Sequence, residues 1–225
     1  MIRSIAIIAA AIQLSQPDMP RAQAERYAKV LRQEAKEHNF DPLTGVAIVH
    51  RESRWIAGAV SEDGEDYGLA QIRARYVGAC RQDADPLHAP SEACKAVKQS
   101  LLQGENNLRV MATLVTLNRE LCKQKTGTAR FEQWLASYEG RNYPGRDRWC
   151  KATDQTRQVL RYRQWLLAEL ARPQRKQADK ARKSTAKRER GQATHRRGAP
   201  IGRAKPAAPR KPAARKAERP KLRSK

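Results

Sequence analysis

The spacing of apolar residues predicts a chain made mainly of α-helices. Apolar positions recur every three or four residues along much of the first 170 residues, as in amphipathic helices. An aspartate followed closely by proline marks two helix starts, near Asp18 and at Asp41. The most apolar stripe lies in residues 105–123, which we expect to form the central buried helix. The expected helices are residues 18–38, 41–55, 67–80, 94–102, 105–123, 129–138 and 154–170.

Strand signals are weak by comparison. Residues 57–68 contain three glycines among Ser, Asp and Glu, which predicts a loop or a short hairpin. Residues 81–93 are rich in Asp and Pro and should be irregular. The sequence therefore predicts a mainly α fold with one small loop or hairpin region.

The N-terminus carries a short apolar run, SIAIIAAAIQL, directly after Arg3. The run is too short to span a bilayer as a stable helix, and a basic residue before such a run is typical of a secretory signal peptide. We predict a signal peptide at residues 1–17, although QLSQPDMP offers no clear small-x-small cleavage site. The alternative is an N-terminal helix that belongs to the core.

The net charge of +23 is unevenly distributed. Residues 171–225 hold 21 Lys and Arg, 3 Asp and Glu and no aromatic residue, whereas the first 170 residues hold 25 basic and 20 acidic residues. Repeated proline and strong self-repulsion leave little to offset the entropy of ordering. We therefore predict a folded domain at 18–172, expected to be monomeric, and a disordered basic tail at 173–225.

The tail should bind polyanions through counterion release without sequence preference. If the protein is exported, its partners would be anionic envelope polymers such as lipopolysaccharide or acidic wall polymers. Nucleic acid is less favoured, because a tail without aromatic residues has no stacking platform for bases. A solvated linker without a dedicated partner is the remaining alternative.

The number of cysteines is even, and no pair of them forms a CxxC motif. Neither their spacing nor the nearby histidines match a zinc site. Two disulfides in an oxidising compartment fit best, and joining sequence neighbours gives Cys80–Cys94 and Cys122–Cys150. This indicates a periplasmic or secreted protein, with four buried free thiols as the alternative.

One window concentrates acidic residues: HRESRWIAGAVSEDGEDYGLAQI, residues 50–72. Glu52 should lie in the last turn of a partly buried helix, where burial and the negative helix end raise a carboxyl pKa. Such a group can act as a general acid. The other four carboxylates of the window lie in the glycine-bearing loop and should stay ionised. One protonated acid facing an ionised carboxylate is the arrangement that cleaves glycosidic bonds.

Four elements, in order, resemble the lysozyme-like lytic transglycosylases. They are RESRW, GEDYGLAQI, ENNLRVMATLV and WLASYEGRNY, and the resemblance lies over residues 40–165. The D-Y-G-L-x-Q-I form resembles the branch related to c-type lysozymes and secretion-system transglycosylases. The resemblance implies a lysozyme-like helical domain that acts on peptidoglycan glycan strands, with no cofactor and no metal. HRESR also lacks the second histidine of a HExxH zinc motif.

The resemblance also implies roles for single residues. Glu52 matches the catalytic acid, and Asp66 matches the second carboxylate of the lysozyme branch. The residues expected at the sugar groove are Ser53, Tyr67, Gly68, Gln71 and Tyr138. Two positions depart from the pattern, Ala70 in place of the common Met and Glu139 in place of an Asn, and the P-x-T-A stretch that often follows the Gln is absent.

The family reaction would cleave the bond between N-acetylmuramic acid and N-acetylglucosamine. Glu52 would protonate the leaving oxygen, and the muramyl C6 hydroxyl would close on C1 to give a 1,6-anhydro product. Two alternatives remain open. Asp66 would suit hydrolysis of the lysozyme type, and loss of activity would leave a lysozyme-like binding protein with a polyanion-binding tail.

Overall fold

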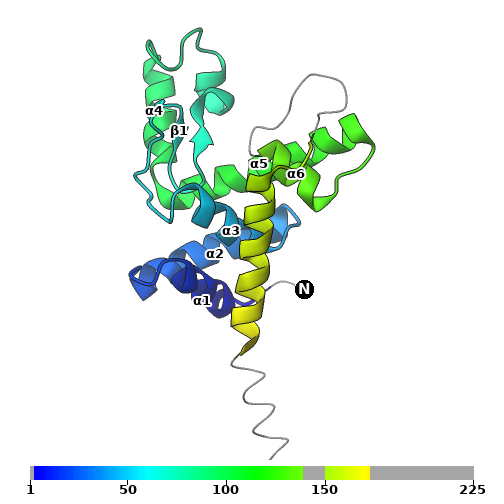
Figure 1. Ribbon diagram of the computed structural model, residues 1–225. Coiled ribbons are helices and arrows are strands. Elements are labelled where there is room, and N and C mark those ends of the chain that lie inside the picture. Colours follow the sequence, from blue (N-terminus) through cyan, green and yellow to red (C-terminus); the bar gives the residue numbers. More distant parts are fainter. Residues whose placement is uncertain (1–2, 139–149, 173–225) are drawn as a thin grey trace, which may run out of the picture. The chain divides into compact units, whose positions relative to one another are not determined.

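The computed structural model describes residues 3–138 and 150–172, and within them the chain is mainly helical (Figure 1). The helices are α1 (Ile5–Ser15), α2 (Arg21–Glu37), α3 (Pro42–Glu52), α4 (Glu92–Leu101), α5 (Gly104–Thr126), α6 (Phe131–Tyr138) and a further helix at 154–172. The chain divides into two units, Met1–Gln177 and Ala178–Lys225. The predicted basic tail at 173–225 lies outside the described residues.

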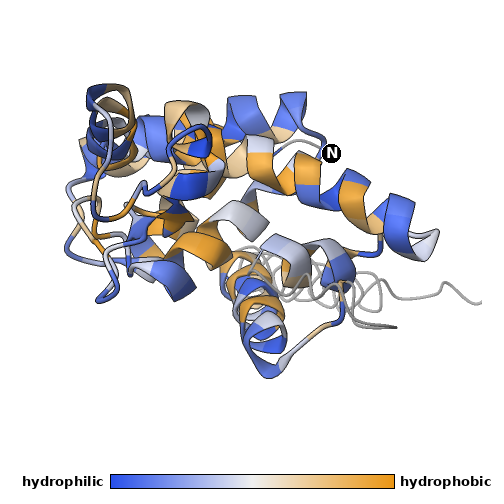
Figure 2. Cartoon of the chain, turned by 90° about the horizontal axis from the view of Figure 1, so that it is seen from above, coloured by the Kyte–Doolittle hydropathy of each residue, from blue (hydrophilic) through white to orange (hydrophobic). Residues whose placement is uncertain are grey.

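The core forms around α5, as its apolar stripe predicts. This helix contacts α2, α3, α4 and α6, and its fully buried side chains include Leu108, Met111, Ala112 and Val115. The helices carry both hydrophobic and hydrophilic residues along their length (Figure 2). Gly45 of α3 allows close packing here, because a Cβ at this position would meet Leu31 at 2.8 Å and Met111 at 3.1 Å.

Helix α1 packs into this core. Its residues Ile8, Ala11 and Ile12 are fully buried, and it contacts α2 and α3. This packing agrees with the alternative prediction, an N-terminal helix that belongs to the core. Removal of residues 1–17 as a signal peptide stays a prediction. Within the described part of the chain, none of the helices combines the length and the apolar character that crossing a bilayer requires.

The start of α3 joins three segments of the chain at Asp41. Its carboxylate caps the helix by accepting the N–H of Leu43 at 3.1 Å, as the Asp-Pro pair predicts. It also accepts hydrogen bonds from Arg3 at 3.0 Å and from Arg163 of helix 154–172 at 2.5 Å. Burial raises the pKa of Asp41, but these hydrogen bonds outweigh it and leave the pKa below its ordinary value.

The helix expected over residues 67–80 is wrong. Strands β1 (Asp66–Tyr67) and β2 (Ile72–Arg73) form an antiparallel hairpin, followed by two 3₁₀ turns, η1 (Ala74–Tyr76) and η2 (Gly78–Arg81). The physical reason lies between the strands, where Gly68 (φ +76°) and Gln71 (φ +46°) adopt left-handed conformations. An α-helix cannot contain them, whereas a tight turn requires such residues.

The disulfides join the predicted pairs. Cys80 of η2 is bonded to Cys94 of α4, and Cys122 of α5 is bonded to Cys150. No described cysteine is free. Both bonds indicate an oxidising, extracytoplasmic compartment.

Candidate functional site

The candidate acid ends a helix. Glu52 is the last residue of α3 and is half-buried. The next residue, Ser53, caps the helix through its N–H, which donates to the carbonyl of Val49 at 3.1 Å. Arg54 and Trp55 then both take left-handed backbone conformations, with φ values of 53° and 67°. The chain therefore turns away sharply behind Glu52.

This turn is strained, because left-handed backbone at a residue other than glycine costs about 1–2 kcal/mol. The surroundings of Trp55 hold it in place. The indole is buried, its N–H donates to the hydroxyl of Ser15 at 2.8 Å, and its ring stacks on Tyr27 with centroids 5.9 Å apart. Core packing by α1 and α2 thus fixes the backbone on which Glu52 sits.

Ser53 ties the end of α3 to the hairpin. Its buried hydroxyl donates to the carbonyl of Leu69 at 2.7 Å. The hydroxyl of Tyr138 at the end of α6 donates to the next carbonyl, that of Ala70, at 2.9 Å. Two residues expected at the sugar groove therefore hold adjacent carbonyls of the turn between β1 and β2.

Asn107 of α5 holds the same turn, and this role was not predicted from the sequence. This fully buried side chain donates to the carbonyls of Tyr67 and Leu101, each at 2.8 Å. Its amide oxygen accepts the N–H of Ala70, also at 2.8 Å. The available signal was the place of Asn107 on the apolar face of α5, four residues before Met111, since buried polar groups are nearly always hydrogen-bonded.

Gly68 is required at this turn for two reasons. It has a positive φ of 76°, and a Cβ there would overlap the amide of Asn107 and the carbonyl of Leu101. Gln71 follows in the same turn, and its side-chain amide donates to the carbonyl of Gly68 at 2.9 Å. The G-L-x-Q-I motif therefore has a structural explanation: its residues form a tight turn that packs directly against α5.

Hydrogen bonds thus bring together all four elements of the resemblance. The end of α3, the β1–β2 turn, the first turns of α5 and the end of α6 meet around residues 67–71. Ser53, Gly68, Gln71 and Tyr138 belong to this cluster, and Glu52 is directly bonded to Ser53 in the chain. We refer to Ser53, Gly68, Gln71 and Tyr138, together with Asn107, as the turn cluster.

Asp66 is engaged elsewhere. Its carboxylate forms two hydrogen bonds of 3.0 Å to Arg73, its cross-strand neighbour. The hydrogen bond that Arg73 donates to Asp66 is the main cause that raises the pKa of Arg73. Arg73 also pairs with Asp63 and Glu65, at 3.4 Å and 3.0 Å. The acidic loop is therefore largely neutralised by arginines.

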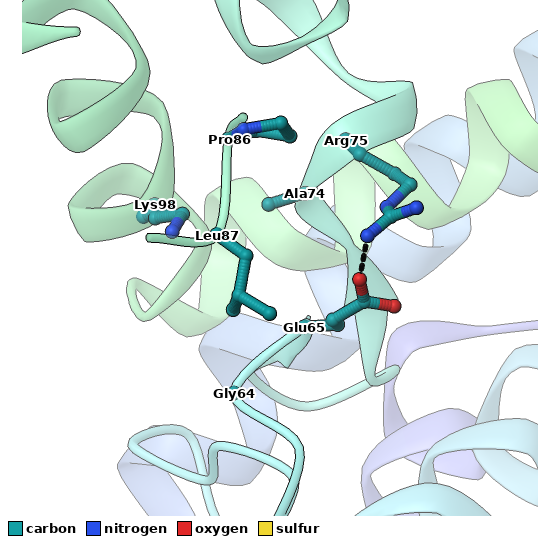
Figure 3. A pocket seen from close by; sticks show the side chains of 7 residues that line it. All are labelled: Gly64, Glu65, Ala74, Arg75, Pro86, Leu87 and Lys98. Carbon is teal, nitrogen blue, oxygen red and sulfur yellow. Dashed lines mark hydrogen bonds and ion pairs between the residues drawn. The ribbon is translucent and has the colours of Figure 1, made fainter. Parts of the chain in front are cut away.

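Neither of the two best-formed hollows in the described part of the chain is lined by Glu52. Figure 3 shows the smaller one, about 10 Å³, beside the ion pair of Glu65 with Arg75. It is too small for a ligand. The larger hollow has a volume of about 520 Å³ and lies at the α2–α3 junction; its lining is Arg3, Ala35, Lys36, Asn39, Phe40, Asp41 and Pro42.

A polar network lies on another side of α3. Arg54 donates to Nε2 of His50 at 2.6 Å. Since a guanidinium can only donate, the ring proton of a neutral His50 must sit on Nδ1, which lies 2.7 Å from the hydroxyl of Ser15. The ring of His50 stacks on Tyr162 with centroids 3.7 Å apart. Burial, followed by the charge of Arg54, lowers the pKa of His50 to about 4.

Stability should therefore fall as the pH drops through the range where His50 resists protonation. Above pH 6.5 the imidazole is neutral in the folded and in the unfolded chain. Between pH 6.5 and 4 it is protonated in the unfolded chain but still neutral in the folded chain, so a falling pH favours unfolding. We expect a loss on the order of 2 kcal/mol after allowance for solvent screening. Urea unfolding followed by circular dichroism at several pH values measures it.

The matched comparison is His50→Gln against His88→Gln, since His88 is an exposed histidine. The first variant should flatten the slope between pH 6.5 and 4, and the second should leave it unchanged. Equal slopes in wild type and His50→Gln would contradict the assignment.

Comparison with known proteins yields no relative: no family model, curated protein or solved structure matches the chain.

Proposed function

We propose that the folded domain, which runs from α1 to helix 154–172, is a lytic transglycosylase with a lysozyme-like fold that cleaves peptidoglycan glycan strands. The convergence of the turn cluster is the observation that carries this proposal. Residues as far apart in the sequence as Tyr138 and Ala70 are hydrogen-bonded to each other at this turn, next to the helix end that carries the candidate acid. The two disulfides agree with work in the periplasm or outside the cell, where the glycan is found.

In this proposal Glu52 acts twice on the MurNAc–GlcNAc bond. Its carboxylic acid first protonates the leaving glycosidic oxygen while positive charge develops at C1 of the muramyl sugar. The resulting carboxylate then takes the proton of the C6 hydroxyl, whose oxygen bonds to C1. The ring closure gives a 1,6-anhydro end and consumes no water, so no second catalytic carboxylate is needed.

The pairing of Asp66 favours this reaction over hydrolysis. A lysozyme-type hydrolase uses a second carboxylate at the sugar ring. Here both oxygens of Asp66 accept hydrogen bonds from Arg73, and Glu65 is paired as well. We therefore assign Asp66 to holding the hairpin together rather than to catalysis.

Digestion of purified sacculi, with mass spectrometry of the released muropeptides, tests the reaction type. We expect anhydromuramyl ends from wild type and also from Asp66→Asn, which weakens one ion pair and should slow the reaction less than about tenfold. Asp63→Asn is the matched control, because Asp63 also faces Arg73 but is more exposed.

Reducing ends from wild type, with activity abolished in Asp66→Asn alone, would establish the hydrolase alternative instead. Sacculi that bind the protein but release no fragments would point to a lysozyme-like binding protein.

A further inference from the structure

Helix 154–172 presents one exposed face that the proposed function does not use. Its side chains Arg157, Arg161, Trp165 and Arg172 are exposed, at spacings of four, four and seven residues. With 3.6 residues per turn these positions fall on one side of the helix. The inward side is marked by Val159 and Leu166, which are buried. The exposed face, here called the arginine–tryptophan stripe, is thus clearly separated from the core.

Trp165 is unusual among the described tryptophans. It is 41% exposed, whereas Trp55 and Trp134 are 5% and 4% exposed. Tyr162 stacks behind it with ring centroids 5.2 Å apart, and Tyr162 itself stacks on His50. A supported indole that faces solvent between arginines is suited to an amphipathic partner.

Three arginines share the exposed face with this indole, and two of them are paired with acidic residues of the same helix. Arg157 pairs with Asp154 at 2.7 Å and Arg172 with Glu169 at 2.9 Å, whereas Arg161 forms no ion pair within the described part of the chain. Arg161 lies one turn from Trp165 on the same face. The sequence that follows, residues 173–225, adds 20 Lys and Arg against 3 Asp and Glu. The basic character therefore continues along the chain directly after the helix.

We propose that the arginine–tryptophan stripe docks on an anionic lipid surface. Arginines bind phosphate headgroups through charge-assisted hydrogen bonds, and tryptophan prefers the level of the headgroups. Stable attachment of a peripheral protein takes two signals, and an apolar contact beside a polybasic segment provides both. The disulfides indicate an oxidising, extracytoplasmic compartment, where nucleic acid is scarce, and this favours a lipid surface over nucleic acid as the polyanion.

Tryptophan fluorescence of the full-length protein tests the docking. The basic segment contains no aromatic residue and is silent, so a change in emission reports on the first 170 residues. Vesicles of phosphatidylcholine with about one third phosphatidylglycerol should shift the emission to the blue. Brominated lipids should quench it. Trp165→Phe should remove both changes, and pure phosphatidylcholine vesicles should cause neither.

Vesicle sedimentation measures the contribution of charge. Arg161→Gln should weaken binding about fivefold, the equivalent of one cationic side chain near an anionic surface. Arg21→Gln is the matched control on α2, with a side chain 82% exposed, and should bind like wild type. Glu52→Gln should also bind normally, so that failure of the catalytic proposal and failure of this one are distinguishable.

Three outcomes would overturn the proposal. Binding without a Trp165-dependent shift or quenching would mean that the basic segment alone holds the vesicles. Equal binding by Arg161→Gln and Arg21→Gln would exclude the helix as a charge contact. A larger Trp165-dependent shift with a single-stranded oligonucleotide than with vesicles would assign the stripe to nucleic acid.

Discussion

Glu52→Gln should abolish the release of muropeptides from sacculi, lowering the rate on the order of 10³-fold or more. The amide has nearly the shape of the carboxylic acid, but it can neither deliver a proton to the glycosidic oxygen nor take one from the C6 hydroxyl. Both steps of the proposed reaction lose their proton carrier in this one substitution. Turbidity of a sacculus suspension follows the rate, and mass spectrometry of the supernatant identifies any residual product.

The control for this variant is Glu120→Gln, the same chemical change at an exposed position on α5. It should digest sacculi at the wild-type rate. Thermal unfolding should be similar for both variants, and Glu52→Gln should still sediment with sacculi. A wild-type rate from Glu52→Gln would remove the central residue of the proposal.

The helices were accessible from sequence because their signals are local. The Asp41-Pro42 pair predicts the start of α3, and the apolar stripe of residues 105–123 predicts the buried α5. The helix predicted for residues 67–80 was wrong because the apolar residues Tyr67, Leu69 and Ile72 have a spacing that fits a helix as well as a hairpin. Only the backbone at Gly68 and Gln71 decides for a turn, and it is set by contacts with α5.

The candidate site was only partly accessible. Motif order pointed to Glu52 and Tyr138, since both are defined by short neighbouring sequences. The roles of Asn107 and Arg73 depend on hydrogen bonds across 37 and 7 residues of sequence, which spacing along the chain does not encode. Asp66 shows the consequence: the motif suggests a catalytic carboxylate, whereas its cross-strand arginine suggests a structural one.

The N-terminal run illustrates a different ambiguity. A short apolar stretch after a basic residue fits the pattern of a signal peptide and also that of a buried helix, because both are made of apolar residues. The packing of Ile8 and Ile12 against α2 and α3, together with the bond between Ser15 and Trp55, ties α1 to the backbone behind Glu52. The support of the candidate acid therefore depends in part on residues 5–15.

Asn107→Leu should be the most destabilising single change in the turn cluster, costing about 3–5 kcal/mol. Leucine has a similar size, but it removes the partner of the buried N–H of Ala70, of the buried carbonyl of Leu101 and of the partly buried carbonyl of Tyr67. An unpaired buried group costs about 1–3 kcal/mol. Urea unfolding at neutral pH with the disulfides intact measures the loss, and hydrogen exchange should rise at residues 67–72.

Asn106→Leu is the matched control, one residue earlier on α5. Asn106 is only half-buried, and its amide donates to the hydroxyl of Ser100 at 2.8 Å, so its replacement should cost about 1 kcal/mol or less. Asn107→Asp separates shape from donor capacity, because a carboxylate still accepts the N–H of Ala70 but cannot donate to the two carbonyls. A loss no greater for Asn107→Leu than for Asn106→Leu would mean that Ser53 and Tyr138 hold the turn without α5, and the site would then rest on α3 and α6 alone.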